Sequence, residues 1–416
     1  MTTIVIGAGV VGLATAYELL KAGHDVVVIE RDEYGQGPSF GNAAVVTGVL
    51  SFPVPAPGTI CVAAKSLLKG GGAISIHPLP TPRFAEFLLR MANATRTSNF
   101  ELGTSAQDLL TINVFHDFDE LIADGLEFEH HQCGMLHVFE SKAALDAALK
   151  PFDDFPTIRE RITVQNSHEE LLAIDPGIAP NFTHGYFAPT DRQVEPMSFM
   201  RALVTAIEEK GGQILEHTSV IDFIRTDGRV SAVVTSSGVY ELDAVVIAAG
   251  VASRKLAAKL GFSLPLYAGG GYSIDVRFQD TELQPRTSVM TDESHIAVTP
   301  LDWGLRASSG MIIGQSEPVV KEKQIAALKK DLTALYPNVP LENVDPGWAG
   351  LRPMSADGVP VIGLIPGTDN AYLTTGHAML GLTYAPSTAK FVRRMLEGED
   401  IPAFELLSPS RFKLRK

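Results

Sequence analysis

The sequence predicts an α/β fold in which two domains are interleaved along the chain. Three observations lead to this prediction. Residues 3–30 follow a strand–turn–helix–strand pattern, short strands return at 213–250, and strand-like alternation continues over 266–315. Because 416 residues exceed what one ordinary hydrophobic core accommodates, the later strands are expected to divide between two domains.

The N-terminal elements are the clearest. The β-branched run at 3–6 predicts a strand, the apolar spacing over 13–23 predicts a helix, and HDVVVIE at 24–30 predicts a second strand. Parallel strands joined through a helix form a βαβ unit, and their continuous valine and isoleucine indicate a sheet covered on both faces. A doubly wound, Rossmann-like domain therefore begins at the N-terminus.

The rest of the chain alternates between helix-rich and strand-rich segments. Helices are expected within 82–126, 143–155, 195–212, 320–336 and 385–398, and strands at 134–140, 213–250, 266–315 and 371–375. The return of strands after each helical segment indicates that the domains are assembled from separate pieces of the chain.

Composition narrows the range of partners. Hydrophobic residues make up 45% of the chain, and the net charge of −14 argues against a nucleic-acid partner and favours small-molecule ligands. The two cysteines, Cys61 and Cys133, build neither a disulfide framework nor a thiolate metal site, which favours the cytoplasm.

One stretch, residues 34–64, contains no charged residue and is long enough to span a bilayer as a helix. Pro53, Pro55 and Pro57 exclude a spanning helix, because a helix interior does not tolerate so many missing donors and ring clashes. The glycines within the N-terminal apolar run, and the lack of a preceding basic residue, also argue against a signal peptide.

The strongest motif is the glycine pattern Gly7, Gly9 and Gly12, which directly follows a predicted strand and opens a helix. The glycines permit a tight turn, close approach of a pyrophosphate and close helix packing. Glu30 ends the next strand, where a carboxylate accepts hydrogen bonds from a ribose and disfavours a 2′-phosphate. The motif predicts a dinucleotide, and by itself leaves both FAD and NAD open.

Two longer segments carry a resemblance to a known family. WAGLRPMSADGVPVIG at 348–363 and TTGHAMLGLTYAPSTA at 374–389, with SFGNAA at 39–44 and VVIAAG at 245–250, resemble FAD-dependent amine oxidoreductases of the D-amino-acid oxidase superfamily. The chain is most similar to small subunits of D-amino-acid dehydrogenases, and more distantly to glycine and sarcosine oxidases. The resemblance implies an FAD domain from 1–44, 191–265 and 345–416, and a mixed-sheet substrate domain from 45–190 and 266–344.

The resemblance also assigns site residues. Arg352 is expected to pair with a substrate carboxylate and Tyr272 to lie near the carboxylate or amine; the alternatives are a structural ion pair and a packing aromatic. His377 is expected to touch the flavin through its backbone rather than to transfer protons. The full set expected to bind the cofactor is Gly7, Gly9, Val10, Val11, Gly12, Glu30, Arg31, Ser39, Asn42, Ala43, Val220, Ala249, Gly250, Gly376, His377, Gly381, Leu382 and Thr383.

The function expected from this reading is oxidative deamination of D-amino acids by hydride transfer to FAD, with a quinone or respiratory acceptor. A secondary-amine substrate, an NAD-dependent dehydrogenase and a non-catalytic flavoprotein subunit remain alternatives. The flavin is expected to be non-covalent, because Cys61 and Cys133 lie outside the motifs, and no metal is expected. The apolar loop at 47–80 is expected either to wall the pocket or to rest on a membrane surface.

Overall fold

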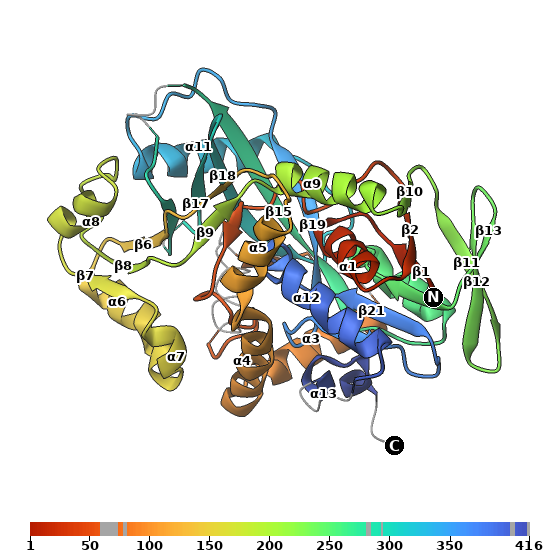
Figure 1. Cartoon of the computed structure of the whole chain (residues 1–416). Helices are drawn as coiled ribbons and strands as arrows, with labels where there is room; N and C mark the ends of the chain where they lie inside the picture. Colours follow the sequence, from red (N-terminus) through yellow and green to blue (C-terminus); the bar gives the residue numbers. More distant parts are fainter. Residues whose placement is uncertain (59–73, 78–80, 280–283, 293, 400–403, 414–416) are drawn as a thin grey trace.

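The computed structural model describes residues 1–58, 74–77, 81–279, 284–292, 294–399 and 404–413. Four sheets organise these residues, two of them large. Figure 1 shows the first large sheet beside the N-terminus and the second beneath α11. The α/β fold with mixed sheets predicted from the sequence is confirmed.

The first large sheet has six strands in the order β10-β2-β1-β14-β21-β20. All neighbours are parallel except the β20–β21 pair. Its strands are β1 (Thr2–Ile6), β2 (Asp25–Ile29), β10 (Gln213–Leu215), β14 (Ala244–Ile247), β20 (Val361–Leu364) and β21 (Ala371–Thr375). The sheet thus gathers strands from the beginning, middle and end of the chain.

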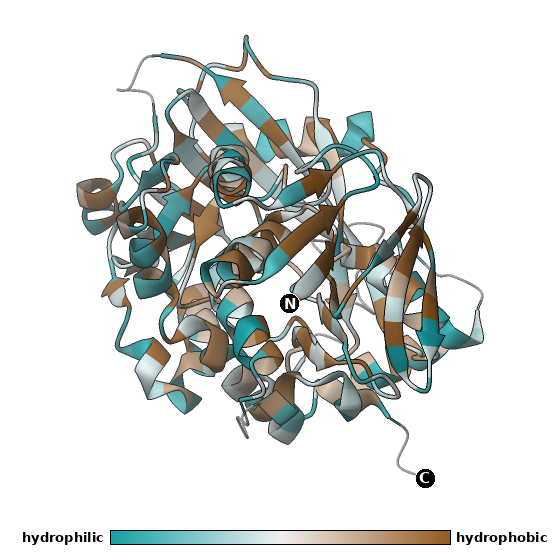
Figure 2. Ribbon diagram, turned by 45° about the vertical axis from the view of Figure 1, so that its right-hand side comes forward, coloured by the Kyte–Doolittle hydropathy of each residue, from teal (hydrophilic) through white to brown (hydrophobic). Residues whose placement is uncertain are grey.

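Helices cover both faces of this sheet, as the buried strand pattern predicts. On one face Val5 packs among α1 (Val10–Lys21), α9 (Pro196–Glu209) and α12 (Gly381–Leu396). On the other face Ile4 and Ile6 pack towards α10 (Ser253–Lys259) and a three-stranded sheet. That sheet consists of β11 (Val220–Thr226), β12 (Arg229–Thr235) and β13 (Val239–Glu241). Figure 2 shows the same layers coloured by residue hydropathy.

The second large sheet has nine strands, in the order β19-β15-β18-β17-β16-β6-β8-β7, with β4 paired to β18. Its strands are β4 (Ile74–Ile76), β6 (Met135–Phe139), β7 (Thr163–Gln165), β8 (His184–Ala188), β15 (Leu266–Arg277), β16 (Ser288–Thr291), β17 (Ala297–Leu301), β18 (Gly304–Ile313) and β19 (Trp348–Ser355). Helix α11 (Glu322–Leu335) packs on one face through Leu328 and Leu332. Arg352 of β19 lies on the opposite face, across from Gly269 of β15.

Smaller elements surround the two large sheets. A short sheet joins β3 (Val45–Val46), β9 (Arg192–Val194) and β5 (His130–His131). The remaining helices are α3 (Pro82–Ala94), α4 (Thr97–Thr111), α5 (Val114–Ala123), α6 (Lys142–Leu149), α7 (Pro156–Arg159), α8 (His168–Ile174) and α13 (Phe404–Leu407), with 3-10 turns at Lys150–Asp154, Gly250–Ala252 and Pro409–Phe412. Figure 1 places α6, α7 and α8 at the edge of the molecule farthest from the N-terminus.

The described part of the uncharged stretch lies largely inside the molecule. Val49 and Ser51 are fully buried, and Pro53 and Pro55 are also buried. Phe52 stacks with Phe100 at a centroid distance of 5.9 Å. The expected membrane contact of the 47–80 loop falls mostly on 59–73 and 78–80, outside the described residues. Among the helices that the structure describes, none is both long and apolar enough to cross a bilayer.

Candidate functional site

The turn between β1 and α1 needs glycine at two of its three motif positions. Gly7 has φ +109°, and a Cβ there would lie 2.7 Å from the Ala248 carbonyl oxygen. A Cβ on Gly12 would lie 1.9 Å from the Gly7 carbonyl oxygen, so a side chain there would separate α1 from the turn. At Gly9 the nearest atom is Ser39 Oγ at 3.3 Å. Gly7 and Gly12 shape the turn, and Gly9 leaves its surface open.

Glu30 lies beside this turn. Its Oε2 accepts a hydrogen bond from the Ala8 amide at 2.7 Å and its Oε1 accepts from the Asp32 amide at 3.1 Å. The carboxylate therefore stands at the end of β2, where a ribose would be bound. Arg31 points elsewhere: its side chain is 67% exposed and pairs with Asp32 at 2.8 Å. Val220 begins β11 shortly after Thr218, whose amide donates to the Glu30 carbonyl.

A second helix begins at the same place. A Cβ on Gly381, the first residue of α12, would lie 4.0 Å from Val11 in the first turn of α1. Neither N-cap residue makes a side-chain cap, so amides in both first turns, apart from that of Val10, which donates to Ser39, remain available to a ligand. Two helix N-termini with their partial positive charges thus face one region. Leu382 and Thr383 are buried in the first turn of α12.

The segment 39–44 lies across the two helix starts. Ser39 Oγ accepts a hydrogen bond from the Val10 amide at 3.2 Å, and Asn42 Nδ2 donates to the Met379 carbonyl at 3.3 Å. The Ala43 carbonyl accepts from Thr299 at 2.6 Å. Ala44 is fully buried with φ +60°, a conformation that non-glycine residues rarely adopt. The segment is thereby held in one conformation between the two large sheets.

The loop before α12 is also closely fixed. Gly376 has φ +80°, and the neighbouring Thr375 hydroxyl donates to the Gly250 carbonyl at 2.9 Å, which brings Ala249 and Gly250 to the same edge. His377 is 4% exposed, and its Nε2 lies 3.1 Å from the Thr388 hydroxyl. Burial lowers the pKa of His377 to about 3, so the ring is neutral. This agrees with a role through the backbone rather than in proton transfer.

Arg352 lies on β19 in the second large sheet, opposite Gly269 of β15. Its Nη1 donates to the Gly310 carbonyl, and no acidic side chain pairs with it in the described part of the chain. Burial lowers the pKa of Arg352 to about 10, which still leaves the guanidinium charged at neutral pH. A partly buried cation without a counter-ion is costly, and a ligand carboxylate would compensate it.

Tyr272 meets Arg352 at Gly310. A Cβ on Gly310 would lie 2.5 Å from the Tyr272 ring, and the same residue accepts the hydrogen bond from Arg352. Burial raises the pKa of Tyr272, which keeps the hydroxyl protonated. The ring also packs against the cluster under α11. The two predicted substrate residues therefore meet at Gly310 from opposite faces of the sheet, Tyr272 from the α11 face and Arg352 from the other.

Sequence reasoning missed Asp191, in the turn between β8 and β9. This residue is fully buried; its Oδ1 accepts from the Gly48 amide at 3.0 Å, and its Oδ2 has no partner at hydrogen-bond distance among the described residues. Burial raises the pKa of Asp191 to about 7. The Thr47 hydroxyl lies beside it, and the Thr47 amide donates to Thr383 of α12. Nothing in the local sequence around Asp191 signals this environment.

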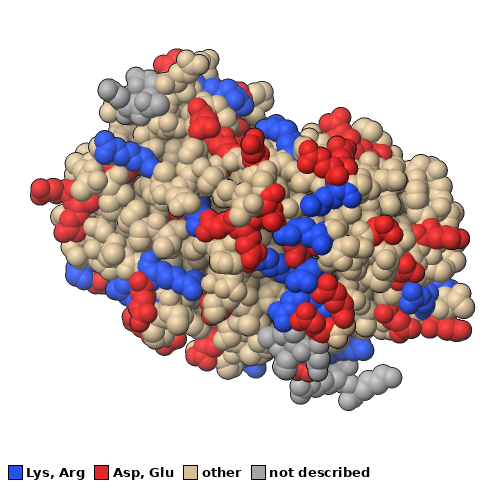
Figure 3. Space-filling model, viewed as in Figure 1, with Lys and Arg blue, Asp and Glu red and all other residues tan. Residues whose placement is uncertain are grey.

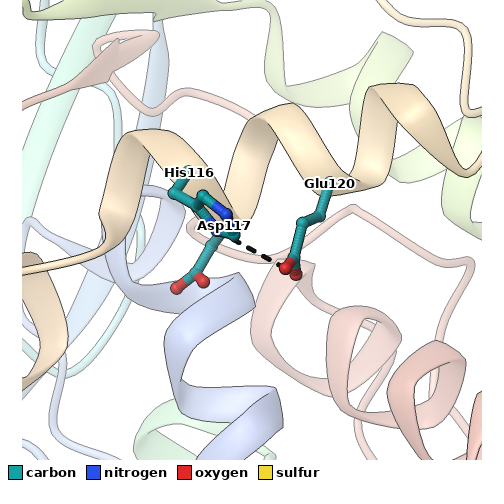
Figure 4. A group of neighbouring side chains, drawn as sticks. All are labelled: His116, Asp117 and Glu120. Atoms are coloured by element: carbon teal, nitrogen blue, oxygen red, sulfur yellow. Dashed lines mark ion pairs between the residues drawn. The ribbon is translucent and has the colours of Figure 1, made fainter.

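Two side-chain groups in the described residues have the composition of metal ligands, His116–Asp117–Glu120 and Glu129–His131–Asp302. Figure 4 shows the first, on one helix, with the His116–Glu120 ion pair dashed. Lys390 of α12 already pairs with Asp117 at 2.7 Å and also with Glu120. The first group is therefore an ion-pair seam between α5 and α12. In the second, His131 lies 3.3 Å from the carboxylate of Glu129 and 3.4 Å from that of Asp302, whose side chain is exposed.

The molecular surface around these elements carries both signs of charge. In the view of Figure 3, Lys and Arg side chains alternate with Asp and Glu and do not merge into one continuous patch on that face.

The glycine turn, Glu30 and the paired helix starts fit a dinucleotide, and the unpaired Arg352 fits a carboxylate; together they define a dinucleotide-dependent enzyme of the oxidoreductase class. Residues 2–395 match the family model described as DAO, FAD dependent oxidoreductase, and the chain belongs to this family. FAD is therefore the dinucleotide, which excludes the NAD alternative.

Individual proteins of similar sequence or fold agree with this family. The chain is 33% identical to a D-amino acid dehydrogenase of Bradyrhizobium diazoefficiens and 31% identical to one of Agrobacterium fabrum, each match covering 96% of both chains. Its fold is similar to glycine oxidase from Geobacillus kaustophilus, with a TM-score of 0.78 and 19% identity over 99% of each chain. It is also similar to L-proline dehydrogenase from P. horikoshii, with a TM-score of 0.78 and 18% identity over 99% of this chain and 97% of that one.

Proposed function

We propose that the chain oxidises D-amino acids to 2-oxo acids and ammonia with FAD as the cofactor. The observation that carries the proposal is Arg352, a partly buried guanidinium with no acidic partner in the described residues. Curated relatives over nearly the full length are named D-amino acid dehydrogenase, which supports the same substrate class. When bound, FAD supplies an acceptor for a hydride from the substrate Cα.

Arg352 binds and orients the substrate in this proposal. Because Nη1 is held by the Gly310 carbonyl, the fork cannot rotate freely, and Nη2 and Nε remain to receive a carboxylate at two points. Tyr272, held at the same glycine, donates its hydroxyl to the carboxylate or accepts from the amine. Fixing these groups places the Cα hydrogen and supplies catalysis by orientation.

No protein base is required at the carbon atom. His377 is neutral and hydrogen-bonded to Thr388, so it does not serve as that base. The substrate amine reacts in its uncharged form, its lone pair assists departure of the hydride, and the imine product hydrolyses in water.

The cofactor is held, in the proposal, by the residues predicted from the motifs. The glycine turn and the first turns of α1 and α12 provide amides for the pyrophosphate and flavin, and Glu30 accepts from the ribose. We also propose that the attachment is non-covalent and that 1–44, 191–265 and 345–416 form the FAD domain, with 45–190 and 266–344 as the substrate domain.

The electrons leave, we propose, to a quinone or another respiratory acceptor, in the cytoplasm and in weak contact with the inner face of the membrane. A test combines two steps. The purified yellow protein is mixed anaerobically with each D- and L-amino acid and with D-proline, sarcosine and glycine, and bleaching near 450 nm is followed. Oxygen or a soluble quinone analogue is then added.

We expect D-amino acids to bleach the flavin and the quinone analogue to restore it faster than oxygen does. Bleaching by L- but not D-amino acids would refute the substrate assignment, and preferential bleaching by D-proline, glycine or sarcosine would favour the secondary-amine alternative. If none of the compounds bleaches the flavin, the alternative of a non-catalytic flavoprotein subunit would be favoured. Colour retained in an acid-precipitated pellet would refute non-covalent attachment.

A further inference from the structure

Two glycines face each other in the ladder that carries Arg352. Strands β15 and β19 are antiparallel, with Gly271 opposite Gly350 and Gly269 opposite Arg352. Side chains alternate along each strand, so Trp348, Gly350 and Arg352 of β19 share one face of the sheet with Gly269 and Gly271 of β15. The glycine pair leaves this face without side chains between Trp348 and Arg352.

The neighbouring side chains cover that bare surface from its two ends. A Cβ on Gly271 would lie 2.5 Å from Arg352 Cζ, and a Cβ on Gly350 would lie 2.0 Å from the outer edge of the Trp348 indole. Because paired Cβ positions in an antiparallel ladder are about 5 Å apart, the guanidinium and the indole edge lie within about 10 Å of each other on one face of the sheet. The side chain of an amino acid whose carboxylate is bound to Arg352 therefore comes within reach of the indole.

Trp348 also reaches the segment that crosses the two helix starts. A Cβ on Gly41 would lie 2.0 Å from the indole, and the Phe40 ring lies at a centroid distance of 6.0 Å. The residue is only partly buried, and its Nε1–H has no hydrogen-bond partner among the described residues. A large apolar ring with an accessible surface thus stands between the proposed flavin segment and Arg352.

The charges on this face restrict what can lie against the ring. Arg306 pairs with Asp275 at 2.8 Å and donates to the carbonyls of Phe40 and Asn42, so its charge is already compensated. Arg352 is the unpaired charge on this face in the described residues. A second charge on a substrate would lose its hydration here without gaining a partner.

We infer that Trp348 is a specificity-determining residue whose indole contacts the side chain of a substrate bound through its carboxylate to Arg352, and that the enzyme favours D-amino acids with uncharged apolar side chains. The inference rests on the proposed function for its substrate class. The apolar area buried between the indole and the substrate should increase with the length of the substrate side chain and should be small for D-alanine.

The test compares kcat/KM for D-methionine and D-alanine in the wild type, Trp348→Phe and Trp348→Ala, with flavin content recorded for each. We expect the ratio of D-methionine to D-alanine to fall about tenfold in Trp348→Ala and less than threefold in Trp348→Phe. Trp303→Phe, which alters the chain's other tryptophan, in the turn after β17, should leave the ratio unchanged. D-glutamate and D-lysine should be poorer substrates than D-methionine.

A binding measurement separates this inference from the proposed function. Calorimetry of the oxidised holoenzyme with benzoate and acetate should give a benzoate preference that falls about tenfold in Trp348→Ala. If Trp348→Ala lowers the benzoate preference but no D-amino acid reduces the flavin of the wild type, the contact of Trp348 is supported and the proposed function is overturned. Unchanged ratios for substrates and for carboxylates in both variants would overturn the role of Trp348.

Discussion

Replacement of Asp191 by asparagine is expected to stabilise the protein, increasingly so as the pH rises. Burial raises the pKa of Asp191 from 3.8 to about 7, with the Thr47 hydroxyl, the Gly48 amide and the charge of Arg161 only partly compensating. An acid whose folded pKa is raised binds its proton more tightly in the native state, so stability falls as pH rises from about 4 to about 7. A pKa shift of about three units lowers the free energy of unfolding by up to about 4 kcal/mol at and above pH 7.

An asparagine removes this titration while retaining an oxygen that accepts from the Gly48 amide. Urea unfolding of the holoenzyme between pH 4.5 and 8.5 should therefore show a stability difference that grows from about 1 kcal/mol at the acid end to about 4 kcal/mol at the other. Asp153→Asn, at an exposed position, serves as the control and should give a difference that is small at every pH. A difference for Asp191→Asn that does not change with pH would refute the reasoning.

Three further predictions concern the site. Arg352→Lys should raise KM for a D-amino acid at least tenfold with bound flavin unchanged, because a lysine cannot bind a carboxylate at two points; steady-state kinetics and absorbance test this. Gly12→Ala should purify without yellow colour, because its Cβ meets the Gly7 carbonyl at 1.9 Å, whereas Gly37→Ala, with open space around it, should remain yellow. His377→Gln should leave the pH profile of kcat/KM unaltered between pH 5 and 9, since the ring is neutral throughout; loss of one limb of the profile would contradict this.

The local parts of the site could be predicted from the sequence. A glycine turn, the strand before it and Glu30 after it lie within 30 residues, so their relation is set by one βαβ unit. A helix after the second glycine turn was also predicted, over 385–398, because a glycine turn before an amphipathic helix is a local pattern; in the structure it begins four residues earlier, at Gly381. Arg352 and Tyr272 came from the family resemblance alone, and their meeting at Gly310 depends on a strand register that no local pattern determines.

Other parts depend on partners far apart in the chain. Asp191 gains its raised pKa from burial beside residues almost 150 positions earlier, and an aspartate in a turn ordinarily faces solvent. In the sequence Trp348 was only one residue of a longer motif. The indole occupies its position because Gly41 and Gly350 have no side chains that would collide with it. Arg31 was expected near the cofactor. In the structure its side chain lies in solvent at the end of β2 and pairs there with Asp32.

The meeting of the α1 and α12 starts has a consequence for biosynthesis. The two helices begin about 370 residues apart in the chain, at Val10 and Gly381. A growing polypeptide therefore exposes its glycine turn long before the segment that completes the cofactor-binding surface has left the ribosome. Contacts between residues so far apart in the sequence form late, so FAD is expected to bind after synthesis is nearly complete. It should then bind only to chains in which the starts of α1 and α12 have come together.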